Sequence, residues 1–486
     1  MPLGLYVSVP FCRTKCSYCN FASDVFSRAV FQGYVDHVCR DIQVAHDTAE
    51  KMGGRFERAV DSVYLGGGTP TVLDITQLER LFVTISQNFE VQPKAEITVE
   101  CAPGTLTQPV LETLLRCGVN RVSLGVQSFV DLEAASVGRL HKRVTVADDI
   151  ARLRSAGISN INIDLIAGLP HQTTESWQVS LAEAIASGAP HASVYMLEVD
   201  EDSRLGRELM AGGTRYHAHF VPDEEVTADL YEMACDRLDA AGVLQYEISN
   251  FARKGHESRH NLKYWTRQPY LGFGVDAHSM LFATRAEARP DRESFVGLKA
   301  HASTVAQAMV ADTGEAMGDQ AKGDQDAPDR NGGQRAGDPH CRTASQSLDL
   351  SHVDDDAVEG HGFSRAVSPP SDRGFSPGGA AVRFATPDSL EAYLADAGVQ
   401  PVPISRQSAL EECFFLGLRL NRGLDLRRVA DEFGEGPVVS LSPTIAELVE
   451  AALLERRADV IRLTPRGRLL SNEVFQRFLS VGETVT

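Results

Sequence analysis

Short apolar segments alternate with helix-like segments through the first 200 residues, and this alternation limits the fold more than any other feature. Segments such as 73–89 and 107–119 repeat apolar residues every three or four positions, as amphipathic helices do. The strand candidates are 4–9, 61–66, 95–100, 121–126, 161–166 and 192–197. Six strand–helix units predict a parallel barrel, open or closed. Several strands are nearly continuous apolar runs, as expected when a parallel sheet is covered on both faces.

The rest of the chain changes character three times, so four regions are predicted. They are a barrel at 1–225, a linker with a polar, aromatic-rich stretch at 226–307, an insertion at 308–384 and a C-terminal domain at 385–486. The insertion is rich in Gly, Asp, Gln, Ser and Pro and is predicted to be disordered, with Cys341 incidental within it. The fold class is therefore α/β, a partial (β/α)6 barrel. It is followed by a C-terminal α+β region ending in a helix, hairpin and helix, a winged-helix-like segment.

Charge and hydropathy exclude several classes of function. The 486 residues include 47 Lys and Arg against 66 Asp and Glu, a net charge of -19, which disfavours binding to nucleic acid or an anionic membrane. The Arg-rich tail is interpreted as a solvated face rather than a DNA-binding surface. No transmembrane run and no signal peptide is recognised, so a cytoplasmic protein is predicted. Peripheral membrane association and a homodimer stay open.

Three of the nine cysteines, Cys12, Cys16 and Cys19, lie within eight residues just after the first predicted strand. Thiolates at such spacing suit a metal site better than a disulfide framework. A structural zinc site normally takes four protein ligands, and no partner pair follows nearby. Three thiolates would leave one iron of a 4Fe-4S cluster without a protein ligand, open to a small chelating molecule. A zinc or purely structural site is the alternative.

The spacing CxxxCxxC resembles the signature of the radical S-adenosylmethionine (SAM) superfamily. This resemblance implies a 4Fe-4S cluster on the three cysteines, with the methionyl amine and carboxylate of SAM chelating the open iron. Reduction would then cleave the sulfonium to a 5′-deoxyadenosyl radical. Tyr6 on the first strand and Tyr18 inside the triad stand where such proteins place an aromatic ring against the adenine, although simple packing is the alternative.

Further motifs of this superfamily follow the later strands, where a parallel barrel forms its active site. The second strand ends in GGGTP, which includes Gly67, Gly68 and Thr69, and the resemblance implies that this backbone receives the amino group of SAM. Polar residues at or after the next strands would contact the ribose, carboxylate and adenine: Glu100, Gln127, Arg139 and Asp164. Taken singly, any of these residues could instead make a structural hydrogen bond.

Within the superfamily, the chain resembles the oxygen-independent coproporphyrinogen III oxidase-like group over nearly its whole length except the insertion. That group contains the oxidase, which decarboxylates two propionates, and the heme chaperone HemW. The oxidase carries a fourth cysteine two residues after the third and an N-terminal arm, whereas this chain has Phe21 there and its first cysteine at position 12. The resemblance is therefore closest to the chaperone branch.

The segment HNLKYW matches the HNxxYW sequence associated with heme in that branch. His260 would supply an axial nitrogen to the iron, and Tyr264 and Trp265 would stack on the macrocycle, while a packed loop is the alternative. A departure from the usual Gly-Ala-His-Ser, with Asp276 before Ala277, makes His278 the second candidate ligand. The predicted function is heme binding and transfer to unidentified acceptor proteins. Oxidative decarboxylation of a porphyrin is the alternative, and enzymatic activity stays open.

Overall fold

The computed structural model describes residues 1–283 and 381–479. The predicted insertion at 308–384, with Cys341, lies outside the described residues except for its last four positions. Those four belong to a strand, β12, at Ala381–Ala385. No helix in the described ranges is long and apolar enough to cross a bilayer.

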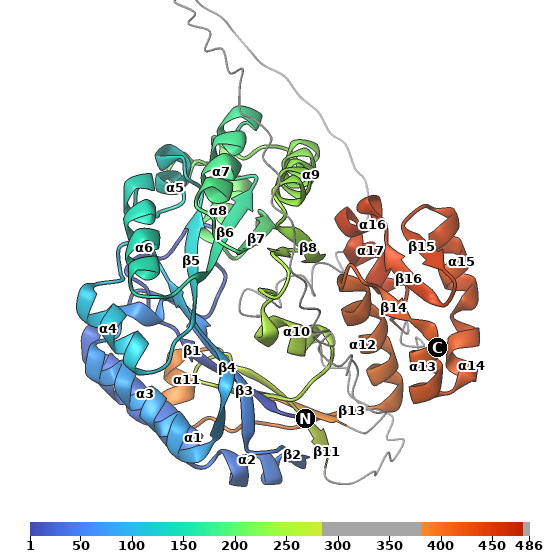
Figure 1. The fold of residues 1–486 in the computed structure, drawn as a ribbon, viewed down its shortest axis with the longest axis horizontal. Coiled ribbons are helices and arrows are strands. Elements are labelled where there is room, and N and C mark those ends of the chain that lie inside the picture. The colour runs from blue at the N-terminus through green and yellow to red at the C-terminus, as the bar shows by residue number, and fades with distance from the viewer. Residues whose placement is uncertain (284–380, 480–486) are drawn as a thin grey trace, which may run out of the picture. The chain divides into compact units, whose positions relative to one another are not determined.

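A single large sheet organises the first part of the chain (Figure 1). Its parallel strands are β1 (Leu3–Val9), β3 (Ala59–Gly67), β4 (Glu90–Cys101), β5 (Arg121–Gln127), β6 (Asn160–Ala167) and β7 (His191–Met196), adjacent in that order. Parallel β10 (Tyr270–Phe273) extends the β1 edge, followed by antiparallel β11 (His278–Ala283), β12 and β13 (Val402–Ile404), with β2 (Gly54–Arg55) beside β11. At the other edge β9 (Asn250–Ala252) pairs antiparallel with β7, and β8 (Leu244–Glu247) pairs antiparallel with β9. The predicted α/β fold with a partial barrel of six strand–helix units is confirmed.

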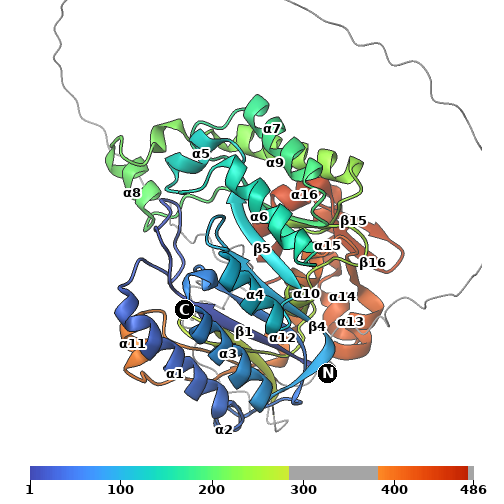
Figure 2. The same cartoon turned by 60° about the vertical axis from the view of Figure 1, so that its left-hand side comes forward.

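Helices connect these strands, and Figure 2 shows α1, α3, α4 and α6 along one face of the sheet. Asp74 begins α3 and Thr173 begins α7 with capping boxes, in which a side chain accepts from the N3 amide. The helices of this part are α1 (Phe31–Gln43), α2 (Ala45–Lys51), α3 (Ile75–Asn88), α4 (Gln108–Arg116), α5 (Asp131–Ser136), α6 (Arg143–Ser155), α7 (Thr174–Ala186), α8 (Arg204–Ala211), α9 (Glu224–Ala240) and α10 (Arg259–Trp265), with 3-10 turns at Arg28–Val30, Pro70–Val72 and Ala218–Phe220.

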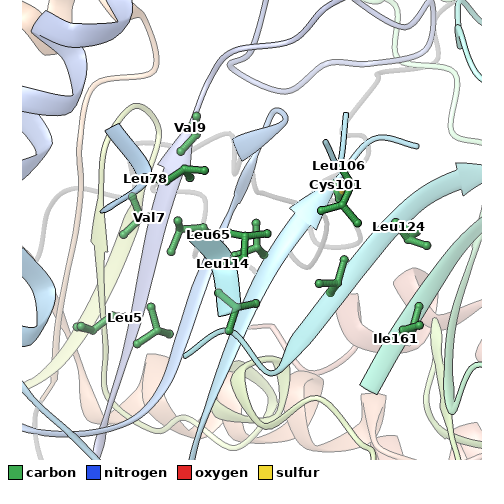
Figure 3. Packing of buried hydrophobic residues seen from close by; sticks show 14 of the residues in the cluster. Leu5, Val7, Val9, Leu65, Leu78, Cys101, Leu106, Leu114, Leu124 and Ile161 are labelled. Carbon is green, nitrogen blue, oxygen red and sulfur yellow. The ribbon is translucent and has the colours of Figure 1, made fainter. Parts of the chain in front are cut away.

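The two faces of the parallel strands differ in chemistry. On the outer face, Leu65, Leu124 and Ile161 belong to one apolar core with Leu78 of α3 and Leu114 of α4 (Figure 3). On the inner face the same strands place polar side chains together: Ser62, Tyr64, Arg121, Ser123, Asn162, Asp164, His191 and Ser193. Both faces are buried, as predicted. The runs interpreted as nearly continuously apolar in fact alternate, because successive strand residues face opposite sides.

The C-terminal part contains a three-stranded sheet of order β14-β16-β15, all antiparallel, surrounded by helices. Its elements are α11 (Leu390–Leu394), α12 (Arg406–Arg419), β14 (Leu424–Asp425), α13 (Leu426–Phe433), α14 (Glu435–Ser440), α15 (Ser442–Glu450), β15 (Leu454–Arg457), β16 (Val460–Leu463), α16 (Pro465–Leu469) and α17 (Ser471–Gln476). The order helix, hairpin, helix matches the predicted winged-helix-like tail.

The short helix α10, which carries the HNxxYW sequence, is held at its start by a carboxylate from β4. Glu96 accepts hydrogen bonds from the backbone N–H groups of Arg259 and His260, both at 3.1 Å. Glu96 is buried, and the unpaired N–H groups of a first helical turn favour a negative charge.

Replacing Glu96 with Gln should lower the free energy of unfolding by about 1 kcal/mol, because the charged acceptor at the start of α10 is lost. Denaturant unfolding of the intact chain measures this. Glu90→Gln, an exposed position on the same strand, is the matched control. Equal midpoints for the two variants would show that the Glu96 charge does not hold α10.

Candidate cluster and cofactor site

The loop after β1, which carries the three cysteines, is fastened to the loop after β3. The Gly68 N–H donates to the Val9 carbonyl at 2.9 Å, and the Thr69 N–H donates to the Phe11 carbonyl at 2.8 Å. A Cβ on Gly68 would lie 2.6 Å from the Val9 oxygen, so any other residue would separate the two loops. Gly68 of the GGGTP motif is therefore required by a close backbone approach.

All three predicted cluster ligands, Cys12, Cys16 and Cys19, line a single cavity of about 280 Å³. Their thiols are free, and the Thr69 hydroxyl lies 3.9 Å from the Cys12 sulfur. Burial raises the pKa of Cys12 to about 11 and also raises the pKa of Cys19. Buried thiols of this kind ionise when a cation neutralises them. Within residues 1–283 and 381–479, no three His, Cys, Asp or Glu side chains converge as around a single metal ion.

The same cavity is lined by most of the predicted SAM residues. They are Tyr18, Gly67, Gly68, Thr69, Glu100, Gln127, Arg139 and Asp164. Tyr6 is the exception, because its ring is buried beside Tyr64, with centroids 6.1 Å apart, and does not line this cavity. The fold thus brings eight of the nine predicted SAM residues to one cavity.

Two carboxylates of the cavity are fixed by hydrogen bonds from the barrel interior. The Tyr64 hydroxyl donates to Glu100 Oε1 at 2.8 Å, and the Gly67 N–H donates to Glu100 Oε2 at 3.2 Å. Asn162 donates to Asp164 Oδ1 at 2.7 Å, and burial raises the pKa of Asp164. Oriented carboxylates can accept hydrogen bonds from the hydroxyl groups of a sugar.

Two other polar side chains of the cavity keep unpaired atoms. Gln127 ends β5 with a left-handed backbone, φ 68°, and its Oε1 is buried without a partner in the described protein. Arg139 donates from Nη2 to the Tyr18 hydroxyl at 3.3 Å, while its buried Nε has no partner there. Backbone strain and unpaired polar groups concentrate at binding sites. These donors and acceptors fit the amino-acid end of SAM.

Other residues of this site were missed by the sequence analysis. Tyr64 and Ser123 orient the two carboxylates, and Tyr195 of β7 lines the cavity. Their signal was present, since polar residues recur at every second position of β3, β5 and β7. Arg419 and Arg468 also line the cavity. Arg468 belongs to the Arg-rich tail interpreted as a solvated face, which is wrong for this residue because its Nε is buried. No local pattern pointed to Arg419.

The residues predicted to hold heme do not line the cavity. His260 is buried, with Nδ1 3.0 Å from the Ser62 hydroxyl and Nε2 2.9 Å from the Tyr264 hydroxyl. Burial lowers its pKa to about 3. Trp265 is also buried, and the Arg419 guanidinium carbon lies 4.2 Å from the centroid of its ring. In this conformation both imidazole nitrogens of His260 already have partners.

His278, the second candidate ligand, is more accessible than His260. Its side chain is 32% exposed, and its Nε2 lies 3.8 Å from Asp276 Oδ1. Burial raises the pKa of Asp276 to about 7. The Asp276 backbone has a φ of 54°, so the departure from the expected motif falls at a strained turn.

Comparison with known proteins agrees with this architecture. Residues 6–184 match the Radical SAM superfamily, and residues 404–470 match the HemN C-terminal domain. The chain is 37% identical over 291 residues to the heme chaperone HemW of Synechocystis, covering 59% of this chain and 68% of that protein. It is 35% identical to the heme chaperone HemW of Escherichia coli, covering 57% of this chain and 70% of the relative. The chain belongs to the HemW family.

Two further likenesses cover nearly the whole chain. The heme chaperone HemW of Bacillus subtilis is 29% identical over 475 residues, 98% of each protein. Among solved structures, coproporphyrinogen III oxidase (HemN) from Escherichia coli, a radical SAM enzyme, has a TM-score of 0.65 at 20% identity, covering 98% of this chain and 90% of that one. At that identity the structural likeness shows a shared fold.

Replacing Asp164 with Asn should weaken SAM binding about tenfold, because a buried charged acceptor is lost, while iron and sulfide contents stay unchanged. Equilibrium binding of SAM to the anaerobically reconstituted protein measures this. Asp148→Asn, an exposed change on α6, is the matched control. Cys12→Ser should instead lose iron and, because the open iron is then gone, SAM binding with it. Unaltered SAM affinity in Asp164→Asn would remove this carboxylate from the site.

Proposed function

We propose that this chain binds heme and passes it to acceptor proteins, and that it holds a 4Fe-4S cluster and SAM in its barrel. The observation that carries the proposal is the match along 98% of the chain to a protein named heme chaperone HemW. Three free cysteines at the wall of one cavity support the cluster. A cytoplasmic location stays a prediction, and a homodimer stays open.

Cys12, Cys16 and Cys19 would hold the cluster, which supplies an electron and an open iron for SAM. The unpaired atoms of Gln127 and Arg139 would bind the methionyl end of SAM. Glu100 and Asp164, already oriented by hydrogen bonds, would accept from the ribose. Every protein group in this assignment lines the same cavity.

The second residue after the cysteine triad supports heme carriage over porphyrin decarboxylation. Phe21 lines the cavity at the position where the oxidase carries a fourth cysteine. An apolar ring there cannot ligate a metal or transfer a proton. The oxidase alternative rests on the shared fold, and whether this chain cleaves SAM productively stays open.

Heme ligation by His260 requires α10 to move. Movement of α10 away from β3 breaks the Nδ1 contact with Ser62. The Nε2 contact with Tyr264, which lies on the same helix, has to break only if Nε2 is the nitrogen that binds the iron, because a ligating imidazole keeps its other nitrogen hydrogen-bonded. Such a change suits a carrier, because the hydrogen bonds that His260 re-forms when α10 returns favour release of the heme. His278 is the alternative ligand, since it needs less rearrangement.

If His260 binds the iron, Ser62→Ala should tighten heme binding about fivefold, because it removes one hydrogen bond that holds the imidazole in its buried, heme-free position. His260→Ala should abolish or move the Soret band of the complex. Heme titration followed by transfer to an apo-hemoprotein measures both steps.

His278→Ala is the comparison variant. A Soret band that moves only in His278→Ala would make His278 the ligand. Heme that binds but never reaches the apo-hemoprotein would contradict the carrier proposal.

A further inference from the structure

The charge of the cavity is opposite to that of the chain. The whole protein has 47 Lys and Arg against 66 Asp and Glu. Among the residues that line the cavity, five are cationic and three are acidic: Arg13, Lys15, Arg139, Arg419 and Arg468 against Glu100, Asp164 and Glu198. The first three cations lie in the cysteine loop or beside it. Arg419 and Arg468 come from the C-terminal part and have no role in the account above.

Arg419 is held in place from three directions. Its Nη2 lies 3.2 Å from Glu247 Oε2, and both side chains are buried. Its guanidinium lies over Trp265, and the next residue pairs through its backbone with Glu247. Asn421 extends this attachment, because its N–H donates to the Tyr246 carbonyl at 3.0 Å. The last turn of α12 is thereby fixed to β8, which makes the guanidinium a rigid group.

Part of each arginine lacks a partner. Arg419 Nε and Nη1 and Arg468 Nε are buried without a hydrogen bond inside the described protein. Leaving such charged donors unmet costs more than about 1 kcal/mol each. A guanidinium whose remaining N–H groups are held in a plane matches the two oxygens of a carboxylate.

We propose that Arg419 and Arg468 bind the carboxylates of a tetrapyrrole whose propionate side chains reach into this cavity. The inference rests on the proposed heme-carrier function and names its recognition group, the propionate side chains. SAM also bears a carboxylate, but Gln127 and Arg139 already provide unpaired groups for it. Trp265 then acts as a positioning residue, because it supports the Arg419 guanidinium and does not itself line the cavity.

The test compares heme with heme dimethyl ester, which lacks the carboxylate charges, on the intact reconstituted protein in a buffer that keeps both dissolved. The native chain should bind the ester at least about tenfold more weakly than heme. Arg468→Gln should lose about tenfold in heme affinity and nothing for the ester. Arg466→Gln, an exposed change in the same helix α16, is the matched control and should bind both ligands like the native chain.

Arg419→Lys gives a second variant that keeps a cation opposite the buried Glu247 and so protects the fold. It should also weaken heme binding, because an ammonium does not reproduce the planar fork. SAM affinity is measured in the same samples. A loss of SAM affinity with heme affinity intact would assign these arginines to SAM and overturn the proposal.

Equal affinity of the native chain for heme and its ester would overturn the inference while leaving the carrier function standing. Failure of the native chain to bind either tetrapyrrole would instead overturn the proposed function, and the inference with it.

Discussion

The backbone pairing of β1 with β3 continues beyond the ends of both strands, and the candidate site depends on this extension. Two hydrogen bonds, from Gly68 to Val9 and from Thr69 to Phe11, fasten the cysteine loop to the GGGTP loop. Only a glycine at 68 leaves room for it. The three thiols and the glycine backbone are consequently parts of one rigid edge, and the remaining parallel strands deliver their polar residues to the same cavity.

The barrel interior links that cavity to α10. Asn162 donates to Asp164 and lies against His191, whose Nε2 is 3.0 Å from the Tyr246 hydroxyl. The Ser258 N–H, at the start of α10, donates to that same hydroxyl at 3.2 Å. A buried network of this kind is rigid when its members are satisfied. It ties the carboxylate assigned to SAM to the helix that carries the HNxxYW sequence.

Local patterns were enough to predict the six parallel strands of the barrel and to single out three cysteines and eight SAM-site candidates that line one cavity. Parallel strands end at one edge, so residues such as Glu100 and Gln127 could be grouped from their positions alone. The polar inner face was missed because Ser62, Ser123 and Asn162 are small or neutral and do not interrupt an apolar run visibly. Their two-residue period is the signal that would have identified it.

What the sequence could not provide is pairing between distant segments. Arg419 reaches the cavity because α12 is attached to β8. Its ion-pair partner, Glu247 of β8, lies 172 residues earlier in the chain. No residue pattern near Arg419 in the chain predicts its ion pair with Glu247. The burial of His260 is equally non-local, since Ser62 belongs to a strand 198 residues away. A motif associated with heme can therefore be present while its imidazole is buried and both of its nitrogens have hydrogen-bond partners.

The central claim is that a radical SAM barrel with Phe21 in place of a fourth cysteine carries heme and does not decarboxylate porphyrins. The most direct test is anaerobic incubation of the reconstituted protein with SAM, reductant and coproporphyrinogen III, followed by chromatography beside an active oxidase. The account predicts no decarboxylated product from protein that retains its cluster and binds SAM. Turnover to protoporphyrinogen would contradict it and make the chain an oxidase.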